Sequence, residues 1–164
     1  MPKNANPMDI IRTCVSLMAL EDKDTKDNSP KANMRKAMRI FAKTPTAVAA
    51  YFRCRKGKKI ISPDKKLSFS ENFFKMMFGK VPDKEIVKAF DISLILYAEH
   101  SFNVSTFTAR TITSSLSDIH GAITGAIASL KGPLHGGANE AVMIMMKEIG
   151  KPEKAQAWIN NALE

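Results

Sequence analysis

The chain has 164 residues, a formal net charge of +9 and 45% apolar residues, but only 7% aromatic residues and two cysteines. This length suits one domain with a substantial core, and Cys14 and Cys54 are too few for a disulfide framework or a cysteine-based metal site. No apolar run has membrane-spanning length and no signal peptide is visible, so we expect a soluble, cytoplasmic protein without a membrane or metal partner.

The positive charge is concentrated in the first part of the chain. Residues 1–102 hold 20 Lys and Arg against 11 Asp and Glu, whereas residues 103–164 hold five of each. The densest stretch, 53–66, has seven basic residues and one acid, but no interleaved aromatic residues that could stack on bases. We therefore expect a solvated loop there and no nucleic-acid partner. The excess charge could help to attract anionic substrates.

The residues predict an all-α chain. Methionine is frequent, and capping residues precede proline, as at many helix starts, in Asn6-Pro7, Ser29-Pro30 and Thr44-Pro45. Gly79, Gly132 and Gly150 follow apolar runs and indicate helix ends. In chain order, the expected helices cover about 7–20, 30–43, 45–55, 68–78, 83–100, 104–117, 118–131, 138–149 and 152–163. Between them, we expect 21–29 to be a polar loop with nothing to bury and 56–66 to be a turn or short hairpin.

The stretch from Asn103 to Leu130 is almost uncharged. Only Arg110 and Asp118 carry charge among these 28 residues, and small residues dominate. A helix pair that is apolar or small on every side should be buried on every side. Small residues at four-residue spacing also let a second helix approach closely. The pattern is compatible both with a central core of one monomer and with a subunit interface.

His100 is the first candidate site residue. The periodicity places it on the inward stripe at the end of the expected helix 83–100, where most histidines are structural. The run Tyr97-Ala98-Glu99-His100-Ser101-Phe102-Asn103, however, leaves His100 and Asn103 together at a helix junction, and such junctions suit small polar ligands. Both a structural and a ligand-binding role remain open for His100.

His135 is the second candidate, in Gly132-Pro133-Leu134-His135-Gly136-Gly137-Ala138-Asn139-Glu140. It precedes an expected helix start, whose dipole favours a neutral imidazole, and a neutral imidazole can donate a hydrogen bond to a developing enolate oxygen. The alternative is a glycine hinge with an incidental histidine. We expect His120, in the middle of its helix, to be structural.

These two runs resemble the citrate synthase family, which includes citrate and 2-methylcitrate synthases. The segment Ser93–Arg110 is similar to the family's first active-site histidine segment, and Gly132–Glu140 continues the match. Asn6-Pro7-Met8-Asp9 resembles the family's Pro-Met-Asp segment. Ser101 stands where the family usually has Glu, which bears on the binding geometry.

The resemblance implies a fold, a reaction and roles for the site residues. It implies a multi-helical, citrate synthase-like fold, with residues 1–134 in the large domain and 135–164 at the start of the small CoA-binding domain. It implies condensation of oxaloacetate with acetyl-CoA or propionyl-CoA, with thioester hydrolysis, an acyl-CoA co-substrate and no permanently bound cofactor. His100 and Asn103 would bind oxaloacetate, and His135 would stabilise the enol of the acyl-CoA as a catalytic residue alongside His100. A homodimer would form through helices 104–131.

The family's Gly-x-Gly-His motif and catalytic aspartate have no counterpart in the 164 residues. Without a base and a second active-site histidine the enol chemistry has no route. We therefore expect an internal piece of the enzyme that is inactive alone. The alternative is a non-catalytic helical module, derived from the family, with a structural or interaction role.

Overall fold

The computed structural model describes residues 2–163, which form helices without any β-strand. The elements are α1 (Pro7–Glu21), α2 (Pro30–Arg55), α3 (Phe69–Phe78), α4 (Lys84–Leu96), α5 (Val104–Thr113), α6 (Ile119–Leu130), α7 (Gly137–Ile149), a 3₁₀ turn η1 (Pro152–Lys154) and α8 (Ala155–Leu163). The all-α prediction is therefore confirmed for this part of the chain.

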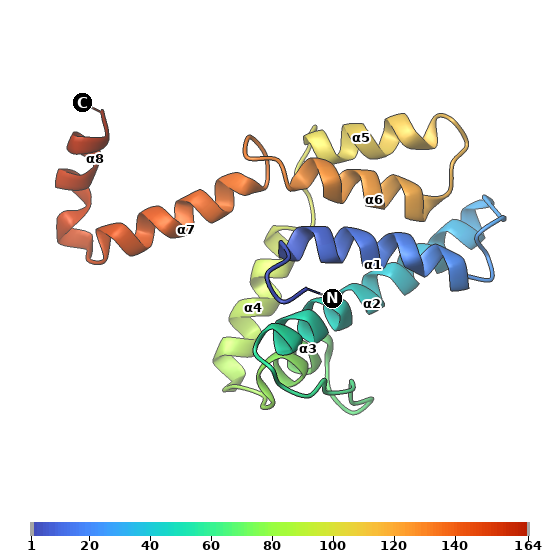
Figure 1. Cartoon of the computed structure of the whole chain (residues 1–164), viewed down its shortest axis with the longest axis horizontal. Coiled ribbons are helices and arrows are strands. Elements are labelled where there is room, and N and C mark those ends of the chain that lie inside the picture. The colour runs from blue at the N-terminus through green and yellow to red at the C-terminus, as the bar shows by residue number, and fades with distance from the viewer. Residues whose placement is uncertain (1, 164) are drawn as a thin grey trace.

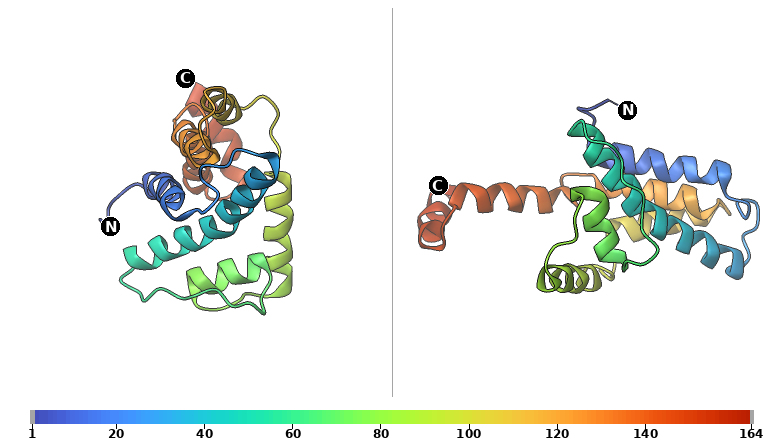
Figure 2. Two further views of the ribbon diagram at one scale, coloured as in Figure 1. Left: turned by 90° about the vertical axis from the view of Figure 1, so that its right-hand side faces the viewer. Right: turned by 90° about the horizontal axis from the view of Figure 1, so that it is seen from below.

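The helices form a packed body and a projecting arm (Figure 1). In the body, α6 packs against both α1 and α5, and α2 lies between α1 and α3. The buried apolar side chains come from these elements: Ile10, Val15, Ala32, Ile40, Ala49, Tyr51, Met76 and Ala122. Beyond residue 137, α7 and α8 extend away from the body, as the right-hand view of Figure 2 shows, and neither helix buries a side chain.

Several helix boundaries follow the predicted chemistry. The side chain of Asn6 accepts from Met8 N at 2.9 Å at the start of α1, and Ser29 accepts from Ala32 N at the start of α2. Gly79 ends α3 with a left-handed φ of 86°, a conformation that other residues adopt at a cost. The capping residues and the glycine therefore predicted these helix ends correctly.

The predicted break at Pro45 is wrong, because α2 continues through it as one helix of 26 residues. Proline removes one helical hydrogen bond and crowds the preceding turn. The helix nonetheless has buried residues on both sides of Pro45, Ile40 and Ala49, which pack into the body. Tertiary packing of the two halves therefore outweighs the local penalty.

Two further predicted ends lie too far along the chain. Helix α4 ends at Leu96 and not at residue 100, and α5 ends at Thr113 and not at residue 117. After α5, the hydroxyls of Ser114 and Ser115 donate to the carbonyls of Thr111 and Ile112 at 2.7 Å, so that side chains compete with helix propagation. The segment 56–66 is a loop with no strand pairing.

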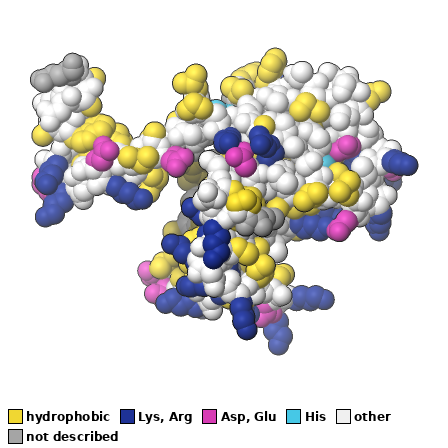
Figure 3. Space-filling model, viewed as in Figure 1, with side chains coloured by type: hydrophobic (Ala, Val, Ile, Leu, Met, Phe, Trp, Pro, Cys, Tyr) yellow, Lys and Arg dark blue, Asp and Glu magenta, His cyan; other side chains and the backbone are white. Residues whose placement is uncertain are grey.

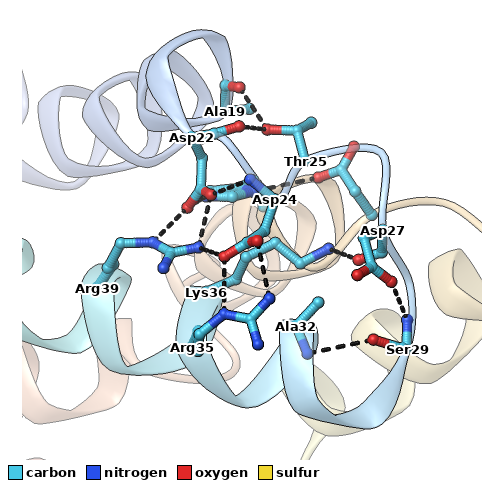
Figure 4. Close-up of polar contacts among 12 residues, drawn as sticks. Ala19, Asp22, Asp24, Thr25, Asp27, Ser29, Ala32, Arg35, Lys36 and Arg39 are labelled. Atoms are coloured by element: carbon cyan, nitrogen blue, oxygen red, sulfur yellow. Dashed lines mark hydrogen bonds and ion pairs between the residues drawn. The ribbon is translucent and has the colours of Figure 1, made fainter.

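The loop 21–29 was wrongly predicted to have nothing to bury (Figure 4). Arg39 of α2 forms a bidentate pair with Asp22, at 2.6 and 2.9 Å, and the Asp22 side chain is only 5% exposed. Arg39 also donates to Asp24 at 2.6 Å, and the buried Lys36 donates to Asp27 O at 2.7 Å. The hydrogen bonds from Arg39 hold the pKa of Asp22 below its usual range.

His120 belongs to the same buried region. It occupies the first turn of α6, not the middle, is 1% exposed, and its Nε2 lies 3.4 Å from Asp22 Oδ2. Because it is enclosed by α6 and the loop after α1, it has no access to a solvent-side ligand. Its position accords with the structural role predicted for it.

Candidate active site

His100 lies in the segment that joins α4 to α5, and the early end of α4 changes its expected orientation. The periodicity predicted an inward-facing side chain at the end of a helix, but His100 is exposed. It lines a pocket of about 450 Å³ between residues 98–103 and one face of α5. The inward orientation was therefore wrong, and the structure places the imidazole where a dissolved molecule can reach it.

Asn103 holds the segment around His100 in place. Its Oδ1 accepts from Thr106 N at 2.7 Å and caps α5, while its Nδ2 donates to His100 O at 2.7 Å. One side chain thus joins the helix start to the backbone of the preceding histidine. Between them, Phe102 has a φ of 56°. Bulky residues rarely adopt this value, and when they do it is often near a functional site. Asn103 itself also lines the pocket.

His135 lies in the turn between α6 and α7, two residues before α7 begins. Its Nε2 is 2.7 Å from Ser105 Oγ in the first turn of α5. The contact occupies one ring nitrogen and leaves Nδ1 for another partner, so a hydrogen bond to Ser105 can select the tautomer. The structure therefore links the second histidine segment to the helix that carries the first pocket.

The turn around His135 is tightly packed. A Cβ added to Gly136 would collide with the carbonyl oxygen and side chain of Leu130, so glycine is required there. Lys131 donates to both carboxylate oxygens of Asp9 on α1, at 2.8 and 2.9 Å, and this contact holds the pKa of Asp9 below its usual range. This ion pair joins the start of the turn to α1 in the body of the molecule.

The structure thus connects the candidate residues through the start of α5. His100 and Asn103 share one pocket, and His135 contacts α5 through Ser105, two residues after Asn103. Ser105 was missed as a site residue, although its position in the same helical turn as Asn103 was a usable signal. Among the described residues, no group of His, Cys, Asp and Glu could hold a metal ion.

Comparison with known proteins identifies the family. The family model "Citrate synthase, C-terminal domain" matches residues 1–164, and the chain belongs to the citrate synthase family. It is 50% identical over 163 residues to a citrate synthase of Mycolicibacterium smegmatis and 52% identical over 163 residues to a 2-methylcitrate synthase of Mycobacterium tuberculosis H37Rv. These matches cover 99% of this chain but 44% and 41% of the two relatives, so the chain spans less than half of their length.

Solved structures support the same family. Citrate synthase from Thermotoga maritima matches with a TM-score of 0.80 and 36% identity, covering 99% of this chain and 42% of that one. Citrate synthase from Thermoplasma acidophilum, solved in a ternary complex with carboxymethyl coenzyme A and oxaloacetate, matches with a TM-score of 0.84 and 29% identity, covering 98% of this chain and 42% of that one. The predicted citrate synthase-like fold is therefore confirmed. No described helix is both long and apolar enough to cross a membrane.

Proposed function

We propose that this chain takes part in a citrate synthase-type condensation, in which oxaloacetate and acetyl-CoA or propionyl-CoA form citrate or 2-methylcitrate with hydrolysis of the thioester. The observation that carries the proposal is the connection of His100, Asn103 and His135 through the first turn of α5. Relatives named citrate synthase and 2-methylcitrate synthase match the chain almost equally well, so both acyl-CoA substrates stay within the proposal.

In this proposal His100 hydrogen bonds to oxaloacetate in the pocket at the start of α5. The exposed imidazole and the pocket of about 450 Å³ suit a small polar acid. Asn103 contributes to oxaloacetate binding by fixing the His100 backbone and by lining the same pocket. A preorganised binding residue avoids the entropy cost of ordering the loop when the substrate arrives.

His135 would polarise the thioester carbonyl and stabilise the enol. With Nε2 held by Ser105, Nδ1 can donate a hydrogen bond to the oxygen on which negative charge develops. A neutral imidazole can donate this hydrogen bond without first losing a proton. Residues 1–134 would belong to the large domain and 135–164 to the start of the small, CoA-binding domain.

Deprotonation of the acyl-CoA methyl or methylene carbon also requires a base. The resemblance assigns this step to an aspartate in a segment beyond the Gly-Gly-Ala-Asn run, which the 164 residues do not contain. We infer that these residues alone bind substrate but do not turn it over.

The proposal also includes a homodimer through α5 and α6, since residues 123–129 of α6 stay half-exposed and Phe107 of α5 is 72% exposed.

Isothermal titration calorimetry with oxaloacetate tests the proposal. The wild-type chain should bind, and His100→Ala should weaken binding about tenfold or more, because a hydrogen bond to a charged ligand is lost. His135→Ala is the matched control and should leave oxaloacetate affinity within about twofold, since it acts on the acyl-CoA. Unchanged binding in His100→Ala, or no binding by the wild type, would contradict the proposal and favour a non-catalytic helical module.

A thiol-independent assay of CoA release tests the inference that the 164 residues bind substrate but do not turn it over. With oxaloacetate and either acetyl-CoA or propionyl-CoA, the 164 residues should release no CoA, whereas a chain that also contains the aspartate segment should. Oxaloacetate-dependent CoA release by the 164 residues would show that the base lies within them. Light scattering on the same sample reports whether the chain is a dimer.

A further inference from the structure

His120 is a buried titratable side chain that the proposed reaction does not use. It is 1% exposed, and neither of its ring nitrogens has a hydrogen-bond partner among residues 2–163. Each nitrogen instead lies close to a carboxylate: Nε2 is 3.4 Å from Asp22 Oδ2, and Nδ1 is 3.5 Å from Asp118 Oδ1. A neutral ring has one unprotonated nitrogen, so either tautomer places a lone pair beside a carboxylate oxygen. Only the charged ring, protonated on both nitrogens, is attracted to both acids.

The two acids belong to a larger charged cluster at the loop between α1 and α2, most of which Figure 4 shows. Its members are Asp22, Asp24 and Asp27 of the loop, Arg35, Lys36 and Arg39 of α2, and Asp118, which caps α6. Three basic side chains therefore accompany four acidic ones, and a positive charge on His120 makes the numbers equal. Arg39 holds the pKa of Asp22 below its usual range, so this carboxylate is ionised at neutral pH.

The charged residues of the other helices that pack on α6 are engaged elsewhere. On α1, Asp9 pairs with Arg12 and with Lys131, which lies beyond the far end of α6, and Glu21 is exposed. On α5, the one charged residue is Arg110, which lines the pocket at the start of that helix. The electrostatic environment of the buried histidine is therefore set by the cluster at the loop.

We propose that protonated His120 is a pH-sensitive lock that holds the loop 21–29 against the start of α6 and opens as pH rises above neutral. Burial opposes charge on the ring, but two carboxylates within 4 Å favour it. The folded chain stabilises the charged ring and the unfolded chain does not. The stabilisation is therefore complete below the unfolded-state pKa of a histidine, about 6.5, and is lost as pH rises further. The lock does not depend on the proposed substrates.

NMR of the histidine rings in the ¹⁵N-labelled wild-type chain tests the protonation state directly. Long-range ¹H–¹⁵N correlations should show both ring nitrogens of His120 protonated at pH 7, and a neutral ring at that pH would overturn the proposal. Hydrogen exchange tests the hold on the loop, because the amides of Asp24 and Thr25 donate to Asp22 Oδ1 and Asp22 O. Their protection factors should fall between pH 6 and pH 8, and constant protection would mean that the ring does not hold the loop.

Urea unfolding of matched variants tests the coupling to stability. The folding equilibrium constant of wild type should be about fivefold larger at pH 6 than at pH 8, and His120→Gln should lose this rise. Asp118→Asn keeps an acceptor for Gly121 N but removes the charge, so it should show a smaller rise even if His120→Gln does not fold. His100→Gln, at an exposed histidine, is the control and should keep the rise. A rise that is absent in wild type, or unchanged in Asp118→Asn, would overturn the lock.

Discussion

The body around α1, α2 and α6 and the segments that carry the candidate site differ sharply in packing. Every buried side chain among residues 2–163 lies at or before Met76, or at His120 and Ala122. His100 is exposed, and His135 and Asn103 are half-exposed, in connecting segments that are positioned by a few hydrogen bonds. The comparison shows a packed body that presents the candidate site residues in less buried segments at helix starts.

The surface also differs between regions of the molecule (Figure 3). Lys and Arg side chains gather around the end of α2, the loop after it and α3, whereas hydrophobic side chains line the arm formed by α7 and α8. The exposed apolar residues of α7 include Val142, Met143, Ile144 and Met146. The basic region is away from the candidate histidines, so any attraction of anions there is separate from binding in the pocket.

Truncation of a core side chain should give the largest effect. Ile40→Ala removes a 4% exposed side chain from α2 and should lower the free energy of unfolding by about 3 kcal/mol, since it leaves a cavity. The comparison variant Ile95→Ala, at a side chain that is 72% exposed, should cost less than about 0.5 kcal/mol. Urea unfolding measures both, and similar losses would contradict the division between the two regions.

Acid should weaken the body through its paired carboxylates. The pKa values of Asp22 and Asp24 are lowered by hydrogen bonds from Arg39 and Arg35, so their stabilisation is complete above the unfolded-state pKa of about 3.9 and is lost as pH falls below it. Urea unfolding between pH 6 and pH 3 should show this loss. Asp22→Asn should be less stable at pH 6 and show a shallower pH dependence, and a slope equal to that of wild type would argue against the pairing.

Loss of the α5 cap should have a smaller effect on stability and a clear effect on binding. Asn103→Ala should lower the free energy of unfolding by about 1 kcal/mol, because Thr106 N loses its partner. Asn103→Asp keeps an acceptor for that amide but loses the donor to His100 O, so it should retain stability while weakening oxaloacetate binding. Unfolding curves and calorimetry on both variants separate the two roles. Undiminished oxaloacetate affinity in Asn103→Asp would show that the contact to His100 is dispensable.

Removal of the end of the arm should have the smallest effect. A variant that stops at Gly150 loses η1 and α8, which bury no side chain, and its free energy of unfolding should change by less than about 0.5 kcal/mol. Oxaloacetate affinity should also persist, since the pocket lies at the start of α5. A large loss of stability would mean that the arm is part of the cooperative unit.

Local sequence signals predicted most helix starts and stops but not the arrangement that long-range contacts decide. Asn6, Ser29 and Gly79 act within one turn, so their roles were readable. The continuation of α2 through Pro45 depends on packing against other helices. The burial of the Asp22 side chain depends on Arg39, 17 residues further along the chain. No local pattern reveals either contact. At the site, motifs identified His100, Asn103 and His135. The exposure of His100 and the contact between Ser105 and His135, 30 residues apart, required the fold.

The most direct test of the central claim is an NMR titration of the ¹⁵N-labelled chain with oxaloacetate. The proposed site predicts saturable shifts of the backbone amides from Ala98 to Arg110, with the largest at His100 and Asn103, and little change in the body around α1 and α2. Shifts confined to the basic stretch 53–66, growing without saturation and disappearing in high salt, would instead indicate nonspecific attraction and would contradict an oxaloacetate site at the start of α5.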